Sequence, residues 1–165
     1  MVENVESAMR NLKAKDVMNP NVLVVTEDMT ASELAAFLTD HEISGAPVVD
    51  DAGRLLGVVS LADLARSVSA SGVARPDRSD PEYFVRGWEE RFNPEDVQHL
   101  RIEADEVTVG DLMSAQVRTV DQETTVRECA RKMLDNHLHR LLVTADGRLA
   151  GILSTLDLVR LLAGE

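Results

Sequence analysis

The stretch GVVSLADL at residues 57–64 recurs as GILSTLDL at residues 151–158, and this recurrence decides the fold. Both copies read Gly, two apolar residues, Ser, two further residues, Asp and Leu, and Gly151 follows Gly57 by 94 residues. Internal repetition at a fixed offset indicates two copies of one supersecondary unit.

The match extends outward from this stretch in both directions. GRL at residues 53–55 meets GRL at 147–149, and DVM at 16–18 meets DLM at 111–113 with an offset of 95. Each copy predicts strand, helix, strand, strand, helix. A unit of about 50 residues buries too little apolar surface to fold alone. We therefore expect one α/β domain of two pseudo-symmetric β-α-β-β-α repeats packed against each other.

The domain organisation follows from the extent of the repeat. We predict an N-terminal segment at residues 1–11, a first repeat at 12–68, an inserted helical linker at 69–106 and a second repeat at 107–165. The insertion contains four of the five aromatic residues, namely Tyr83, Phe84, Trp88 and Phe92. Three of these share one helix face, which either packs on the body of the protein or forms a lid or partner surface.

Local signals define the elements of each repeat. Thr30 with Glu33, and Thr125 with Glu128, have the spacing of helix capping boxes. Gly in the sequences DAG and DG predicts tight hairpin turns. The apolar stripe after each cap indicates a buried helix face and assigns Cys129 to core packing. The predicted strands are Val22–Val25, Ala46–Val49, Arg54–Val59, Leu141–Thr144 and Arg148–Leu153.

Charge and composition exclude several functional classes. The chain has 17 Lys and Arg against 29 Asp and Glu, a formal net charge of −12. Such a surface repels nucleic-acid backbones and anionic lipids. No apolar run approaches the roughly 18 residues of a membrane helix. The charged N-terminus and single cysteine suit a cytoplasmic protein, so we expect neither nucleic-acid nor membrane partners.

The Ser-x-x-Asp motif within the repeated stretch has two interpretations. Ser60 with Asp63, and Ser154 with Asp157, have the spacing of a helix cap. Alternatively, the helix start and the serine hydroxyl bind a phosphate, while the carboxylate accepts the two hydroxyls of a ribose. In that interpretation the preceding glycine lets a ligand approach the backbone. Capping alone does not require the same Gly and Asp twice.

These motifs together resemble those of paired CBS domains, also called the Bateman module. The resemblance rests on DVM and DLM, on ISGAPVV at residues 43–49 and on the two Gly-x-x-Ser-x-x-Asp-Leu runs. It implies repeats paired through their sheets, a regulatory role, a homodimer and an adenosine-containing ligand such as AMP, ADP, ATP or S-adenosylmethionine. It also implies a cleft between the repeats as the place where that ligand binds.

The resemblance also implies roles for individual residues. Asp63 and Asp157 would bind ribose. The phosphate would meet Ser60, Ser154, Thr155, His139 and Arg140. The base would lie among Val22, Val25, Ala46 and Pro47 in one site, and among Val117, Val120, Leu141 and Leu142 in the other. Ser44-Gly45 stands where the second repeat has His139-Arg140, so we expect unequal sites.

The leading hypothesis is a regulatory module that senses an adenosine-containing ligand and acts through its own dimer or a partner protein. The alternative is a structural or protein-interaction module in which both motifs only cap helices and the aromatic insertion forms the partner surface. We predict no enzyme, because no nucleophile–base pair is evident. We also predict no metal site, because His137 and His139 lack a third ligand. The net charge favours AMP or a dinucleotide over ATP unless Mg²⁺ or Arg140 compensates.

Overall fold

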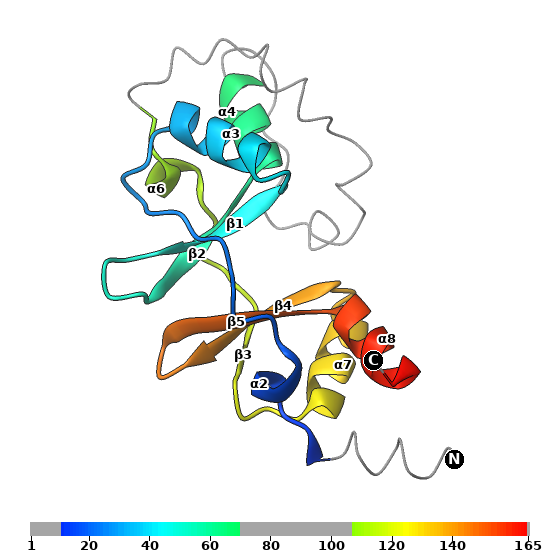
Figure 1. Ribbon diagram of the computed structural model, residues 1–165. Helices are drawn as coiled ribbons and strands as arrows, with labels where there is room; N and C mark the ends of the chain where they lie inside the picture. Colours follow the sequence, from blue (N-terminus) through cyan, green and yellow to red (C-terminus); the bar gives the residue numbers. More distant parts are fainter. Residues whose placement is uncertain (1–10, 70–106, 165) are drawn as a thin grey trace. The chain divides into compact units, whose positions relative to one another are not determined.

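The computed structural model describes residues 11–69 and 107–164, which form two compact units (Figure 1). The first-repeat unit comprises residues 23–69 and 107–117, and the second-repeat unit comprises residues 11–22 and 118–164. The four aromatic residues of the insertion lie outside the described residues. The mixed α/β architecture with duplicated units confirms the predicted fold class.

The first-repeat unit contains a two-stranded antiparallel sheet. Its hairpin joins β1 (Gly45–Val49) to β2 (Leu55–Ser60). The helices α3 (Ala31–Asp40) and α4 (Leu61–Ser69) pack against each other, and the short α6 (Val109–Leu112) contacts α4. The predicted strand Val22–Val25 is wrong in extent, since only Val25 forms an isolated bridge with Val48. The boundary between the two units lies between residues 22 and 23, so the predicted strand would have to cross it.

The second-repeat unit contains a three-stranded sheet in the order β3-β4-β5. The strand β3 (Thr119–Asp121) is parallel to β4 (Arg140–Ala145), which pairs antiparallel with β5 (Arg148–Ser154). The helix α7 (Val126–Asp135) connects β3 to β4, and α8 (Thr155–Ala163) follows β5. In Figure 1 these two helices lie side by side, and the short α2 (Ala14–Val17) packs against both of them and against β5.

The predicted local signals produce the expected structures. The Thr30 hydroxyl accepts a hydrogen bond from the Glu33 amide at 3.2 Å, and the Thr125 hydroxyl accepts one from the Glu128 amide at 3.3 Å. Gly53 and Gly147 both have φ of +77°, the left-handed conformation that a tight turn needs. Helix starts and hairpins are therefore encoded locally in both repeats.

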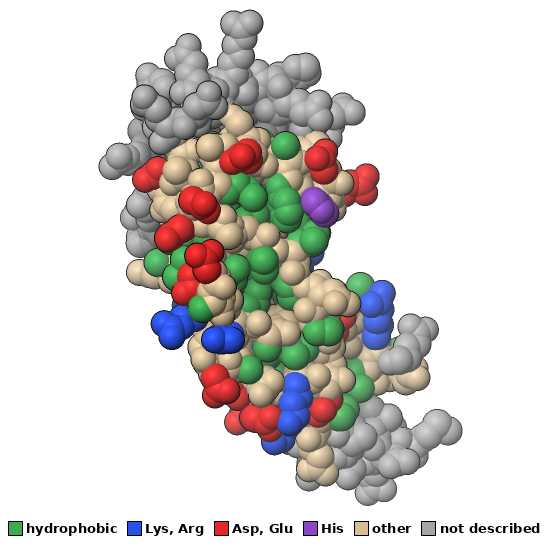
Figure 2. Space-filling model, turned by 60° about the vertical axis from the view of Figure 1, so that its left-hand side comes forward, with side chains coloured by type: hydrophobic (Ala, Val, Ile, Leu, Met, Phe, Trp, Pro, Cys, Tyr) green, Lys and Arg blue, Asp and Glu red, His purple; other side chains and the backbone are tan. Residues whose placement is uncertain are grey.

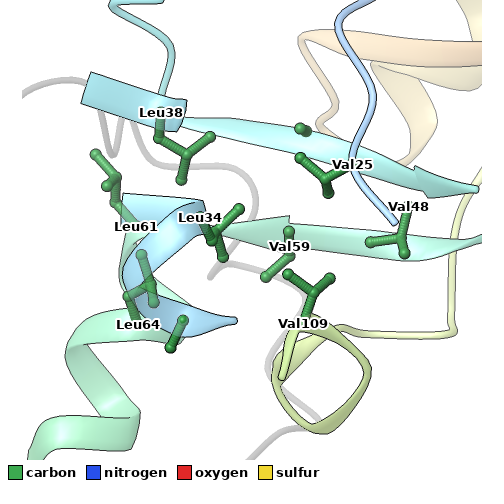
Figure 3. Close-up of a cluster of buried hydrophobic side chains, with 10 residues drawn as sticks. Val25, Leu34, Leu38, Val48, Val59, Leu61, Leu64 and Val109 are labelled. Atoms are coloured by element: carbon green, nitrogen blue, oxygen red, sulfur yellow. The ribbon is translucent and has the colours of Figure 1, made fainter. Parts of the chain in front are cut away.

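Each unit has its own hydrophobic core. Figure 3 shows the core of the first-repeat unit, where side chains from α3, α4, the hairpin and α6 meet, among them Leu34, Leu64 and Val109. The second core contains Val126, Leu141 and Leu153. Cys129 is fully buried in this second core, as predicted, and burial raises the pKa of its thiol.

Each unit is completed by the segment that precedes the other repeat in the sequence. We call residues 11–22 the N-terminal arm and residues 107–117 the central arm. The Ala14 amide donates to the Thr124 carbonyl, and the Val109 amide donates to the Met29 carbonyl, both at 2.8 Å. Ala14 and Val109 are fully buried, each in the core of the unit that its arm joins. The two arms are thus exchanged between the repeats.

Candidate functional site

The predicted ligand-binding motifs lie at the two corners where β2 runs into α4 and β5 runs into α8. In the first corner, Asp63 Oδ2 accepts hydrogen bonds from the Ser60 amide at 2.8 Å and the Ser60 hydroxyl at 2.7 Å. The Asp63 amide in turn donates to Ser60 Oγ at 3.3 Å. The second corner repeats this pattern between Ser154 and Asp157, at 2.7, 2.6 and 3.2 Å. Both motifs therefore cap their helices.

Capping uses only one of the two carboxylate oxygens, and the two corners differ in the other. Asp63 Oδ1 forms an ion pair with Arg66, one turn along α4, and the Asp63 side chain is 11% exposed. Arg160 stands at the same spacing from Asp157 on α8. Among residues 11–69 and 107–164, no ion pair or hydrogen bond occupies Asp157 Oδ1. Within the described part of the chain, the second corner alone presents an uncommitted carboxylate oxygen.

Most hydrogen-bond donors at the start of each helix are already used by the protein. The Leu61 amide donates to the Ser44 carbonyl at 3.0 Å, and the Thr155 amide donates to the His139 carbonyl at 2.9 Å. The third amide of each helix donates to the capping serine. A phosphate at either corner would therefore depend on side chains more than on free backbone N–H groups.

The side chains that lie near a phosphate position also differ between the corners. Arg140 is exposed and pairs in register with Ser154, which places it beside the start of α8. His139 is exposed next to it, and Thr155 is half-buried. The equivalent positions in the first corner hold Ser44, Gly45 and the buried Leu61. Among the described residues, the cation of the first corner, Arg66, is paired with Asp63, whereas the second corner adds Arg140 and the Thr155 hydroxyl beside Asp157.

The residues predicted to surround the base are largely core residues. Val25 is 1% exposed and Leu141 is 1% exposed, so both side chains face the hydrophobic clusters. Ala46, Val120 and Leu142 are also buried, as is Pro47. Val22 and Val117 are half-buried in the arms, each in the opposite unit from Val25 and Val120 respectively. What the buried positions offer a ligand is their backbone rather than their side chains.

The role predicted for Gly57 and Gly151 is corrected by the structure. A Cβ on Gly57 would lie 2.7 Å from the Ser114 carbonyl oxygen and 3.0 Å from Met113 Sδ. A Cβ on Gly151 would lie 2.5 Å from Met18 Sδ and 2.9 Å from the Asn19 carbonyl oxygen. The arms, and not a ligand, make the close approach that these glycines permit.

Surface charge matters for any anionic ligand. Figure 2 shows acidic side chains on one face of the molecule with hydrophobic side chains between them, in keeping with the net charge of −12. Because such a surface repels anions, the guanidinium of Arg140 is the main local compensation at the second corner.

The described part of the chain has no group of three His, Cys, Asp or Glu placed to hold a metal ion. It also has no helix long and apolar enough to span a bilayer.

The structure shows two features that the sequence analysis does not predict, although each has a signal in the spacing of its residues. Arg66 lies three residues after Asp63 on one helix face, a spacing at which opposite charges meet. The DVM and DLM motifs contribute to the resemblance, and the structure adds a role for their aspartates. Asp16 and Asp111 accept hydrogen bonds from the Lys13 and Thr108 amides at 2.8 and 3.0 Å, which caps the short helix of each arm.

Comparison with known proteins identifies the family. The model of the CBS domain matches residues 14–70 and 109–164. The CBS domain-containing protein CBSX2, chloroplastic, of Arabidopsis thaliana is 34% identical over 148 residues, which cover 88% of this chain and 61% of the relative. A crystal structure of CBSX2 in complex with AMP has a TM-score of 0.64 at 26% identity, covering 93% of this chain and 97% of that chain.

A further relative has an enzymatic name. The zinc metalloprotease MJ0392 of Methanocaldococcus jannaschii is 29% identical over 159 residues, which cover 96% of this chain and 34% of the relative. This chain thus spans between about a third and three fifths of the length of these curated relatives. Two family matches that together span most of the described residues leave one conclusion: the chain belongs to the CBS domain family and carries a pair of these domains.

Proposed function

We propose that this CBS pair is a regulatory module that binds an adenosine-containing ligand at the corner between β5 and α8. The observation that carries the proposal is the uncommitted Asp157 oxygen beside Ser154, Thr155 and Arg140. A carboxylate with a free oxygen accepts hydrogen bonds from vicinal ribose hydroxyls. The guanidinium of Arg140 offsets the charge of a phosphate. CBSX2 in complex with AMP supports a ligand of this class.

The ligand is tested with a matched pair of variants. Asp157→Asn and Asp63→Asn remove the same capping carboxylate from equivalent helices, so their effects on the helix cap are comparable. A thermal-shift panel would use AMP, ADP, ATP, S-adenosylmethionine and NAD, with and without Mg²⁺. A ligand at 100 times its Kd stabilises the folded state by about 2.7 kcal/mol. We expect AMP to raise the Tm of the wild type and of Asp63→Asn, and to leave the Tm of Asp157→Asn unchanged. Equal loss in both variants would contradict the assignment to the second corner.

A second candidate function is a protein-interaction module without a nucleotide. It is favoured by the capping geometry of both Ser-x-x-Asp motifs, which needs no ligand. It is also favoured by α8, where Leu156, Val159 and Leu162 are 55%, 56% and 57% exposed. Apolar side chains gathered on one helix are typical of contact surfaces. No thermal shift with any compound of the panel would favour this function over the sensor.

In this proposal the chain has a regulatory role and not a catalytic one. The thiol of Cys129, a potential nucleophile, is buried and its pKa is raised, which keeps it protonated and unreactive. The same proposal gives the module a cytoplasmic location and a homodimeric state through which, or through a partner protein, the ligand acts. Sedimentation velocity with and without AMP tests the homodimer directly.

A further inference from the structure

Two methionine sulfurs lie against glycine backbones at equivalent positions in the two units. Met18 Sδ is 2.5 Å from the Cβ position of Gly151, and Met113 Sδ is 3.0 Å from that of Gly57. Neither thioether could be this close if the glycine carried a side chain. We call each arrangement a methionine seat, formed by the methionine, the glycine and the arm residue after the methionine.

Each seat adjoins the hydrogen bonds that hold an arm to its unit. The Asn19 amide donates to the Ile152 carbonyl at 2.8 Å, and the Ile152 amide donates back to Asn19 at 2.9 Å. Ser114 and Val58 exchange the equivalent bonds, at 2.9 and 3.0 Å. Since Met18 precedes Asn19 and Gly151 precedes Ile152, a group added to the sulfur would lie next to this attachment.

Each seat brings a methionine sulfur and a backbone carbonyl oxygen within 3.0 Å of the same glycine Cβ position. The carbonyl oxygens of Asn19 and Ser114 lie 2.9 and 2.7 Å from the glycine Cβ positions. These oxygens are acceptors, and a sulfoxide oxygen is also an acceptor, so the two would repel. Met18 and Met113 also pack on the hydrophobic clusters of their units, where a polar group is unfavourable.

The seated methionines are accessible, while a core methionine is not. Met18 and Met113 are half-buried, whereas Met133 is 3% exposed in the second core. Because Met18 and Met113 retain solvent exposure that Met133 lacks, we expect a hydroperoxide to react with them first, and Met133 serves as an internal reference.

We propose that Met18 and Met113 are a duplicated pair of oxidation sites whose conversion to sulfoxide releases the two exchanged arms. In the reaction the thioether sulfur attacks a hydroperoxide. The O–O bond breaks as the S–O bond forms, sulfur loses two electrons, and the peroxide is reduced to water or an alcohol. The sulfoxide no longer fits its seat, and the adjoining backbone hydrogen bonds open. This inference is independent of the adenosine ligand and goes beyond the sensing role.

The test is a hydrogen peroxide titration of the full chain with two readouts. Peptide mapping by mass spectrometry measures sulfoxide at each methionine, and thermal unfolding measures the Tm. We expect Met18 and Met113 to oxidise at least tenfold faster than Met133. We also expect the Tm of the wild type to fall by about 5 °C or more and to recover after treatment with methionine sulfoxide reductases.

The control is the double variant Met18→Leu with Met113→Leu, which preserves apolar volume and lacks the oxidisable sulfur. Its Tm should be unaffected by the same peroxide treatment. If the double variant does not fold, each single variant is used with hydrogen exchange at the arm amides Asn19 and Ser114. In a single variant only the arm that keeps its methionine should exchange faster after oxidation. Equal oxidation of Met133, or exchange in the arm without a methionine, would overturn the proposal.

Discussion

The corner after β2 and the corner after β5 have the same cap but different chemistry. Ser60 with Asp63, and Ser154 with Asp157, form superimposable patterns of hydrogen bonds. Arg66 then engages the remaining oxygen of Asp63, while Arg160 at the same spacing leaves Asp157 uncommitted within the described ranges. The duplicated motif thus keeps its capping role in both copies, and under the proposed function only the second copy also binds the ligand.

The largest expected effect concerns the two cores. Leu34 and Cys129 occupy equivalent helix positions and are both fully buried. Leu34→Ala removes three carbon atoms from the first core and should destabilise the protein by about 2–5 kcal/mol. Cys129→Ala removes one sulfur atom and should cost about 1 kcal/mol. Urea unfolding followed by circular dichroism measures both, and a larger loss for Cys129→Ala would contradict the packing seen in the two cores.

The next effect concerns the glycines beneath the arms. Gly57→Ala should cost roughly 1–3 kcal/mol, because its Cβ would meet the backbone oxygen of Ser114 at 2.7 Å. Gly151→Ala should cost less, because its backbone contact is longer, 2.9 Å to the Asn19 carbonyl oxygen, and its nearest neighbour is the flexible end of Met18. Thermal unfolding of the two variants gives the order. Equal stability of both variants and the wild type would show that the arms do not approach the strands closely.

Loss of the capping serine should lower the stability of the protein equally at both corners but should lower AMP affinity at only one. Ser60→Ala and Ser154→Ala each remove the hydroxyl that accepts from the third helix amide, a loss of about 1 kcal/mol. Only Ser154→Ala should also lower the affinity for AMP, which isothermal titration calorimetry measures. A parallel loss of AMP affinity in Ser60→Ala would place ligand binding in both corners.

The smallest expected effect concerns the ion pairs of the N-terminal arm, which the central arm lacks at the equivalent positions. Glu123 pairs with Lys13 and Lys15 of the N-terminal arm, whereas the central arm has Thr108 and Gly110 at the equivalent positions. Hydrogen bonds from these lysines lower the pKa of Glu123. Their contribution is therefore present above the ordinary glutamate pKa of about 4.3 and is lost as the pH falls through the lowered value.

Hydrogen exchange tests this difference at neutral pH. High salt screens exposed ion pairs, so 1 M NaCl should accelerate exchange in the N-terminal arm and leave the central arm unchanged. Glu123→Gln should have the same effect at low salt and should abolish the response of that arm to salt. A salt response of equal size in the central arm would contradict this expectation. It would show that ion pairs, and not only backbone hydrogen bonds and apolar contacts, attach that arm to its unit.

Much of the fold could be predicted because its signals are local. The capping residues Thr30 and Thr125 and the turn glycines Gly53 and Gly147 specify their structures within a few residues. The exchange of the arms could not be predicted, because DVM and DLM are nearly the same motif and the sequence does not distinguish their packing partners. Periodicity reveals that a segment repeats but not which copy it packs against.

The candidate site could be predicted in part for a similar reason. The sequence places Asp63 and Asp157 at the third position of a helix, and both carboxylates are found there. Whether Arg66 or Arg160 turns toward its aspartate depends on the surroundings of each helix, which the identical spacing does not encode. The apolar character of Val25 and Leu141 fits a base pocket and a core equally well, and the structure shows both side chains buried in the cores.

The most direct test of the central claim is an NMR titration of the ¹⁵N-labelled chain with AMP. We expect the amide signals of Arg140, Thr155 and Asp157 to shift with a common Kd. The signals of Gly45, Leu61 and Asp63 should shift far less. Dominant shifts at Gly45, Leu61 and Asp63, or no shift at either corner at millimolar AMP, would contradict the claim that the corner after β5 is the ligand-binding corner.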